Sequence, residues 1–163
     1  MRKSIPLFLK GDNGKSCEGC TKCCEGYLTA DINGEEIGPG KPCKACVKDS
    51  GCSIYKDRPK DPCRSFECFW RASEVMPKEF KPSEIGVIVT NQQIDGIPYL
   101  VLNEAGNQVS VDVLSWFVKH AVDRQLNIEW QIGNVYHAMG SREFNMALAR
   151  RAEALDTLEN KEK

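Results

Sequence analysis

The sequence predicts an α+β protein with two unlike halves: a cysteine-rich, loop-dominated N-terminal half, and a small C-terminal half with a mostly antiparallel sheet and two helices. Two observations support this division. All nine cysteines of the 163 residues lie between Cys17 and Cys68. The apolar patterns that are typical of strands and helices become regular only after residue 82. We therefore expect one module at residues 1–82 and a small α+β domain at residues 83–163.

The N-terminal half is poor in residues that build a hydrophobic core. Gly, Pro, Lys and Asp are frequent in it, and no helical or strand period runs through it. Short helical turns are expected beside the cysteines, at Ile32–Ile37 and Cys63–Ala72. A module of this size with so few apolar residues is expected to need a bound metal for its stability.

The C-terminal half shows regular strand patterns at its start. Ile85–Thr90 and Ile97–Leu102 are short and rich in β-branched residues, and Asp95-Gly96 between them is a turn signal. These segments predict a hairpin. A further short strand is expected at Val109–Val111.

Two amphipathic helices are predicted after these strands. Asp112 is expected to cap the first, which ends near Asn127. Ile128–Ile132 alternates apolar and polar residues and predicts a strand between the helices. Ser141 is expected to cap the last helix, whose apolar stripe runs to Leu158.

Charge and apolar content restrict the partners and the compartment. Lys and Arg number 22 against 23 Asp and Glu, so a nucleic-acid partner is not expected. No apolar run is long enough for a membrane span, and residues 1–10 lack the pattern of a signal peptide. We expect a cytoplasmic protein without a membrane partner. Clustered cysteines in that compartment more often bind metal than form disulfides.

The cysteine spacing predicts metal binding. The first cysteines form a C-x2-C-x2-C-C run, Cys17-Glu-Gly-Cys20-Thr-Lys-Cys23-Cys24. Thiolates at such short spacing can point to one centre. Side chains of neighbouring residues diverge, so Cys24 is expected either to bridge to a second centre or to serve that centre alone. Nine thiols could fill two four-ligand sites with one left over, and the spacing leaves the partition open. The cofactor is expected to be zinc or iron, and an iron–sulfur cluster is one form of the iron centre.

Three blocks of the N-terminal half resemble the CxxCxxCC cysteine-cluster family, which is described as zinc- or iron-chelating. They are the first cysteine run followed by Glu-Gly26, the block Cys46-x5-Cys52-Ser-Ile-Tyr55-Lys-Asp-Arg58-Pro59, and Cys63-Arg-Ser-Phe-Glu-Cys68. The likeness covers residues 17–70. It departs from the family pattern in having three residues between Pro59 and Cys63 instead of two, and in the additional Cys43.

The resemblance implies which thiols hold the metal and which one is spare. The implied ligands are eight: Cys17, Cys20, Cys23, Cys24, Cys46, Cys52, Cys63 and Cys68. Cys43 is then the spare thiol. The two histidines of the chain, His120 and His137, have no second ligand at metal-binding spacing, so neither is expected to be a ligand.

Cations near the cysteines are expected to offset the negative charge of metal-bound thiolates. Arg58 and Arg64 are the candidates for this role at the cofactor. Lys22 and Lys44 also lie close to cysteines, but the planar guanidinium suits sulfur better than an ammonium group does.

Two function hypotheses follow. The first is a metal-binding protein without an identifiable reaction, whose C-terminal half recognises a protein partner. The alternative is an iron-dependent redox or group-transfer enzyme, which would need an open coordination position. The sequence contains no G-x-S-x-G, P-loop or G-x-G-x-x-G motif that would indicate another chemistry.

Overall fold

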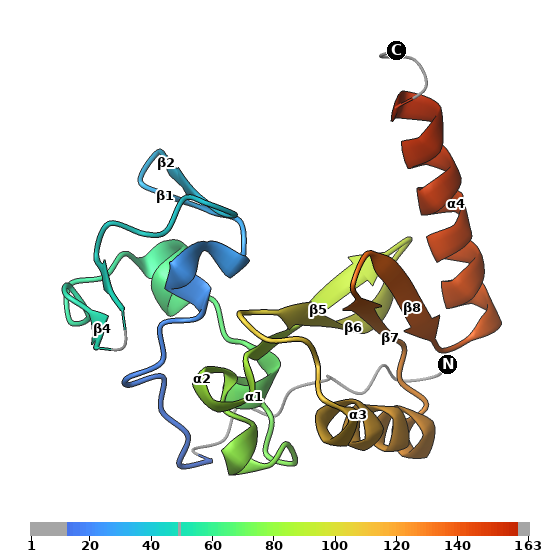
Figure 1. The fold of residues 1–163 in the computed structure, drawn as a ribbon, viewed down its shortest axis with the longest axis horizontal. Helices are drawn as coiled ribbons and strands as arrows, with labels where there is room; N and C mark the ends of the chain where they lie inside the picture. The colour runs from blue at the N-terminus through green and yellow to red at the C-terminus, as the bar shows by residue number, and fades with distance from the viewer. Residues whose placement is uncertain (1–12, 49, 160–163) are drawn as a thin grey trace. The chain divides into compact units, whose positions relative to one another are not determined.

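The computed structural model describes residues 13–48 and 50–159, and it is an α+β protein (Figure 1). The chain forms two compact units. One contains the described residues of Met1–Thr90 together with Asn103–Gln108, and the other contains those of Asn91–Leu102 and Val109–Lys163. The first unit thus extends past residue 82. A module that folds by itself within residues 1–82 stays a prediction.

Before residue 87, the described part of the first unit contains only short elements. In chain order they are η1 (Cys23–Tyr27), β1 (Ala30–Ile32), β2 (Glu35–Ile37), β3 (Cys46–Val47), β4 (Gly51–Cys52), η2 (Lys60–Arg64), α1 (Phe69–Ala72), η3 (Lys78–Phe80) and α2 (Pro82–Ile85). Its buried apolar side chains include Phe69, Trp70 and Met76. The indole N–H of Trp70 donates to the carbonyls of Pro77 and Lys78, at 3.1 and 3.0 Å.

The helical turn expected at Ile32–Ile37 is wrong, because this segment belongs to the antiparallel β1–β2 hairpin. Asn33 and Gly34 connect the two strands with φ angles of 55° and 85°. The side chain of Asp31 accepts a hydrogen bond from the backbone N–H of Gly34 at 2.8 Å. An Asn-Gly pair with two positive φ angles is the preferred two-residue hairpin turn, and it was the signal for a hairpin here.

The turn expected at Cys63–Ala72 is divided in two. Cys63 lies in η2, and Cys68 precedes the four-residue helix α1 in an extended conformation. The intervening residues 66–68 are not helical. The segment therefore places two cysteines on separate elements.

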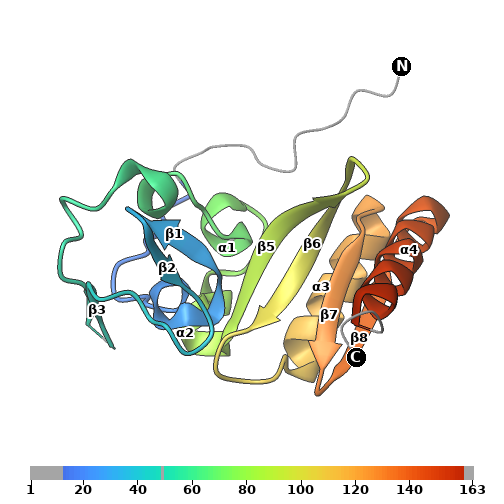
Figure 2. The same ribbon diagram turned by 90° about the horizontal axis from the view of Figure 1, so that it is seen from above.

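A four-stranded sheet runs in the order β5 (Val87–Ile94), β6 (Ile97–Glu104), β7 (Ile128–Ile132), β8 (Val135–Met139). Figure 2 shows the four strands side by side. β5 and β6 form the predicted hairpin, with Asp95 and Gly96 both at positive φ. β6 pairs with β7 in parallel and β7 with β8 antiparallel. The mostly antiparallel sheet is confirmed, although β8 was not predicted.

Helix α3 (Val111–Arg124) connects β6 to β7. The strand expected at Val109–Val111 and the cap expected at Asp112 are both wrong, since the Ser110 hydroxyl caps the helix and accepts from the backbone N–H of Val113 at 3.3 Å. Serine favours the capping position because its oxygen satisfies an unpaired N–H of the first turn. The helix buries Val113, Phe117 and Ala121.

Helix α4 (Arg142–Glu159) follows β8 and begins after Ser141, as predicted. Phe144 is buried, with its ring centroid 5.1 Å from that of Tyr99 on β6. The predicted apolar stripe packs only in the first half of the helix, because Leu155 and Leu158 are exposed. None of the helices in the described part of the chain is long and apolar enough to cross a membrane.

Candidate metal centre

The nine cysteines all lie in the first unit, and all nine are free thiols. Cys68 is buried and the other eight are half-buried. The positions are set by different elements: Cys23 and Cys24 begin η1, Cys46 and Cys52 face each other across β3 and β4, and the remaining cysteines lie in or beside loops and η2.

The first group of thiols comes from residues 17–23 and from the residue that precedes helix α1. Its members are Cys17, Cys20, Cys23 and Cys68. The backbone N–H of Cys20 donates to the carbonyl of Cys17 at 2.9 Å, which closes a tight turn between them. Burial, and after it the charges of Cys68, Cys20, Cys24 and Cys17, raise the pKa of Cys23. The sulfurs of this group therefore lie close enough for their charges to interact.

Long-range hydrogen bonds hold this first group together. The amide of Asn13 donates to the carbonyl of Arg71 at 2.9 Å, and the ammonium of Lys15 donates to the carbonyls of Ser73 and Met76 at 2.6 Å each. These bonds attach the segment that leads to Cys17 to the segment that follows Cys68. Lys15 is buried, and burial lowers its pKa.

Helix α1 offers backbone donors to the sulfur of Cys68. Burial raises the pKa of Cys68 to about 11, while hydrogen bonds from the backbone N–H groups of Arg71 and Trp70 act in the opposite direction. Such N–H groups stabilise a thiolate. This arrangement suits a sulfur that binds metal, because hydrogen bonds to a ligand atom help to hold it in position.

A second group of thiols comes together around Cys24. Its members are Cys24, Cys43, Cys46, Cys52 and Cys63. The backbone N–H of Cys43 donates to the carbonyl of Cys24 at 2.8 Å, and that of Cys46 donates to the carbonyl of Cys43 at 3.0 Å. Burial, and after it the charges of Cys43, Cys46, Cys52 and Cys63, raise the pKa of Cys24 to about 12.

The approach of Cys43 to Cys24 depends on a glycine. Gly26 has a φ angle of 88°, and a Cβ at this position would overlap the carbonyl oxygen of Gly38. Gly38 and Lys41 then form an isolated β-bridge, which turns the chain back toward Cys24. Because only glycine fits both the φ angle and the close approach, Gly26 allows the second group to form.

Two arginines act on the thiols. The positive charges of Arg71 and Arg58 oppose the burial that raises the pKa of Cys17, and the charge of Arg58 does the same at Cys63. The charge of Arg58 therefore reaches a thiol of each group, and its predicted role at the cofactor stays a prediction. Arg64 is exposed, and its predicted role stays a prediction. Arg71 was missed, although its place three residues after Cys68, one turn along a helix, was a usable signal.

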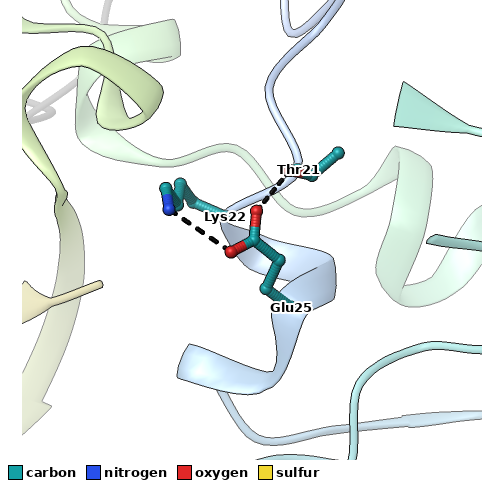
Figure 3. A network of polar contacts seen from close by, with 3 residues as sticks. All are labelled: Thr21, Lys22 and Glu25. Atoms are coloured by element: carbon teal, nitrogen blue, oxygen red, sulfur yellow. Dashed lines mark hydrogen bonds and ion pairs between the residues drawn. The ribbon is translucent and has the colours of Figure 1, made fainter. Parts of the chain in front are cut away.

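The two lysines near the cysteines pair with carboxylates. Figure 3 shows Glu25 between Thr21, whose hydroxyl donates to one carboxylate oxygen, and Lys22, whose ammonium lies 3.3 Å from the other. Burial alone would raise the pKa of Glu25, but these hydrogen bonds lower it overall. Lys44 is exposed and pairs with Glu35 at 2.6 Å.

The thiols lie near one another, but their side chains are not arranged as a complete set of metal ligands. Within residues 13–48 and 50–159, no group of three or more His, Cys, Asp or Glu side chains is arranged so that it could hold a metal ion. The donor set itself suits zinc or iron, since thiolates are the ligands that both structural zinc and iron–sulfur clusters use. The buried Nε of Arg58 also lacks a hydrogen-bond partner. Its N–H group could therefore donate to a ligand that binds beside it.

The histidines of the second unit are engaged elsewhere. The ring of His120 stacks on that of Trp116 with centroids 4.8 Å apart, and His137 stacks on Trp130 at 5.6 Å. Both contacts lie in the second unit, whereas all the cysteines lie in the first.

Three comparisons with known proteins were made. No protein-family model, no curated protein and no solved structure matches this chain.

Proposed function

We propose that this protein binds zinc or iron through its clustered cysteines, with an iron–sulfur cluster as one form of the iron centre. The observation that carries the proposal is that nine free thiols, spread over residues 17–68, come together in one compact unit as two groups. Free thiols that crowd together in this way carry a cost when they ionise, and a bound cation removes that cost.

The surroundings of the thiols support the same proposal. Arg58 and Arg71 bring positive charge to the sulfurs, and the N-terminal N–H groups of helix α1 point at Cys68. These are the contacts that orient and neutralise metal ligands. When a metal is bound, it would cross-link segments that lie far apart in the sequence.

The proposed location is the cytoplasm, because clustered cysteines in a reducing compartment more often bind metal than form disulfides. A protein partner for residues 83–163 stays a prediction, and the exposed Tyr136 and Val135 of β8 are available to contact one.

Purification under anaerobic conditions, followed by elemental analysis, sulfide analysis and an absorption spectrum, tests the proposal. A brown protein with iron and sulfide identifies a cluster, and a colourless protein with zinc identifies a thiolate zinc site. The alternative of an iron-dependent enzyme requires iron together with a reaction at an open position. Protein that contains neither metal, and that takes up neither Zn²⁺ nor Fe²⁺ after reduction of its thiols, would refute metal binding.

A further inference from the structure

We propose that the cysteines form two separate metal centres, an inference that rests on the proposed metal binding. The first centre is held by four thiols, and the second takes its ligands from the other five. The members of the first are Cys17, Cys20, Cys23 and Cys68. The members of the second are Cys24, Cys43, Cys46, Cys52 and Cys63.

The first centre is defined by the contacts between two distant segments. Asn13 and Lys15 bind carbonyls of residues 71–76, and the ammonium of Lys81 donates to the carbonyl of Glu18 at 2.7 Å. Cys17 and Cys20 are thereby held beside Cys68, although about fifty residues separate them in the chain. None of these bonds involves residues 43–63, which carry four of the five cysteines of the second group.

The second centre is defined by backbone hydrogen bonds of its own. Cys24, Cys43 and Cys46 are connected in sequence by N–H to carbonyl bonds, and Cys46 lies opposite Cys52 in the β3–β4 ladder. Cys63 lies in η2, which packs against strand β1, and its thiol interacts with those of Cys43 and Cys52. The chain therefore brings these five thiols together without using any contact that forms the first group.

The boundary between the two centres is the peptide bond between Cys23 and Cys24. Side chains of adjacent residues leave the backbone in different directions, so one of these thiols can face each centre. Their interactions differ accordingly: Cys23 interacts first with Cys68 and Cys20, and Cys24 interacts first with Cys43 and Cys46. The C-x2-C-x2-C-C run thus supplies three ligands to one centre and one to the other.

Arg58 stands where it can serve both centres. Its charge reaches Cys17 of the first group and Cys63 of the second. Two tetrathiolate zinc centres would each carry a charge of about −2, and a cation between them reduces their repulsion. One cation that interacts with thiols of both groups would lower the repulsion between two neighbouring anionic centres.

Paired substitutions in the full chain test the partition. The double variant Cys17→Ser with Cys20→Ser disables the first centre, and Cys52→Ser with Cys63→Ser disables the second. After loading with Zn²⁺ and removal of excess metal, the unsubstituted chain should hold two equivalents and each double variant one. Co²⁺ substitution, read by its absorption bands, should show that the remaining centre keeps thiolate ligands in each variant.

A second measurement uses the unsubstituted chain and so does not depend on how a variant folds. The chain is loaded with a single equivalent of Zn²⁺, its free thiols are alkylated, and the modified cysteines are identified by mass spectrometry of intact molecules. Each molecule with one metal should protect thiols of one group only. Molecules that protect Cys20 together with Cys52 would overturn the partition.

Failure of the partition can be told from failure of the proposed function. If the unsubstituted chain binds one equivalent, or if a double variant loses both equivalents at once, the nine thiols act as one cluster and the two-centre inference is wrong while metal binding holds. If the unsubstituted chain binds no metal, the proposed function itself is wrong.

Discussion

The guanidinium of Arg58 lies over the ring of Tyr55, with its central carbon 3.9 Å from the ring centroid. The stacked ring limits the movement of the arginine, and its Nε is buried without a hydrogen-bond partner. A cation held over an aromatic face is stabilised by the ring. The charge is therefore fixed in place near Cys17 and Cys63 before any metal binds, instead of being drawn to the site afterwards.

Replacing this arginine should weaken metal retention. We expect Arg58→Gln to reduce metal affinity about 10–100-fold, as is typical when a residue that supports a metal ligand is changed. Competition with a chelator of known affinity measures the loss. Arg64→Gln removes the same charge from an exposed side chain six residues away, so its effect should be smaller. Unchanged affinity in Arg58→Gln, with loss of binding to an anionic molecule, would place Arg58 in a different kind of site.

Cys43 should act as a reserve ligand of the second group. The resemblance makes it the spare thiol, and the structure places it within the five, bonded through its backbone to Cys24. Cys43→Ser should therefore keep both metal equivalents. Cys24→Ser should also keep them, at reduced affinity, because Cys43 can replace the lost sulfur. Metal analysis of the two variants and of Cys24→Ser with Cys43→Ser checks this.

The Cys43→Ser variant can be compared with a cysteine variant of the first group. That group has four thiols and no spare, so Cys20→Ser should lose one equivalent. Loss of an equivalent from Cys43→Ser alone would show that the thiol is an obligatory ligand.

The regular elements of the second unit were predictable because local signals agreed with packing. The Asp95-Gly96 turn, the apolar spacing of α3 and the Ser141 cap each act over a few residues. Strand β8 was missed because Val135 and Tyr136 are exposed and its pattern is not apolar. The short strand expected at Val109–Val111 was wrong because Ser110, in the middle of that segment, caps helix α3.

The residue types of the candidate site could be predicted from the sequence, but the way in which the cysteines group in space could not. Cysteine spacing identified the clustered thiols from the sequence, and the position of Arg58 between Cys52 and Cys63 made it a candidate cation. The partition depends on contacts such as Lys15 with Ser73 and Met76, which join residues about sixty positions apart. No local pattern encodes such contacts. The same holds for the close approach of Gly26 to Gly38, which is visible only after folding.

Metal binding should release protons. Burial raises the pKa of Cys24 to about 12 and that of Cys68 to about 11, with neighbouring thiols contributing. These thiols are thus protonated near pH 7, and each must lose its proton to bind metal. We expect about four protons released per Zn²⁺ bound to four thiols, and an affinity that falls as the pH falls. Calorimetric titration in buffers of different ionisation enthalpy counts the protons.

The direction in which metal affinity changes with pH distinguishes thiol ligands from other ligands. Because the pKa values of these cysteines are raised, the protons are still present over the whole neutral range and the affinity should rise steadily toward alkaline pH. An affinity that is independent of pH between about 6 and 8 would mean that the metal binds groups other than these thiols.

The second unit should be destabilised separately from metal binding. Phe117 of α3 is fully buried, and Phe117→Ala should reduce the free energy of unfolding of this unit by about 3–5 kcal/mol. The metal content of the chain should not change, since the cysteines lie in the first unit. Thermal unfolding followed by circular dichroism, with metal analysis of the same sample, measures both. A lost metal equivalent would show that the two units depend on each other.

Removing the metal should unfold residues 17–70 and leave the second unit folded. The elements of this segment are two to five residues long, and elements so short are not stable without packing or a cross-link. A bound metal would join segments that are also held by the hydrogen bonds of Asn13, Lys15 and Lys81. After chelation under reducing conditions, limited proteolysis should cut within residues 17–70 while the fragment that contains α3, β7, β8 and α4 resists. Re-addition of Zn²⁺ should restore the protection, which excludes irreversible oxidation as the cause. Equal protease resistance of residues 17–70 before and after complete metal removal would show that hydrogen bonds and the core around Trp70 suffice to hold this segment.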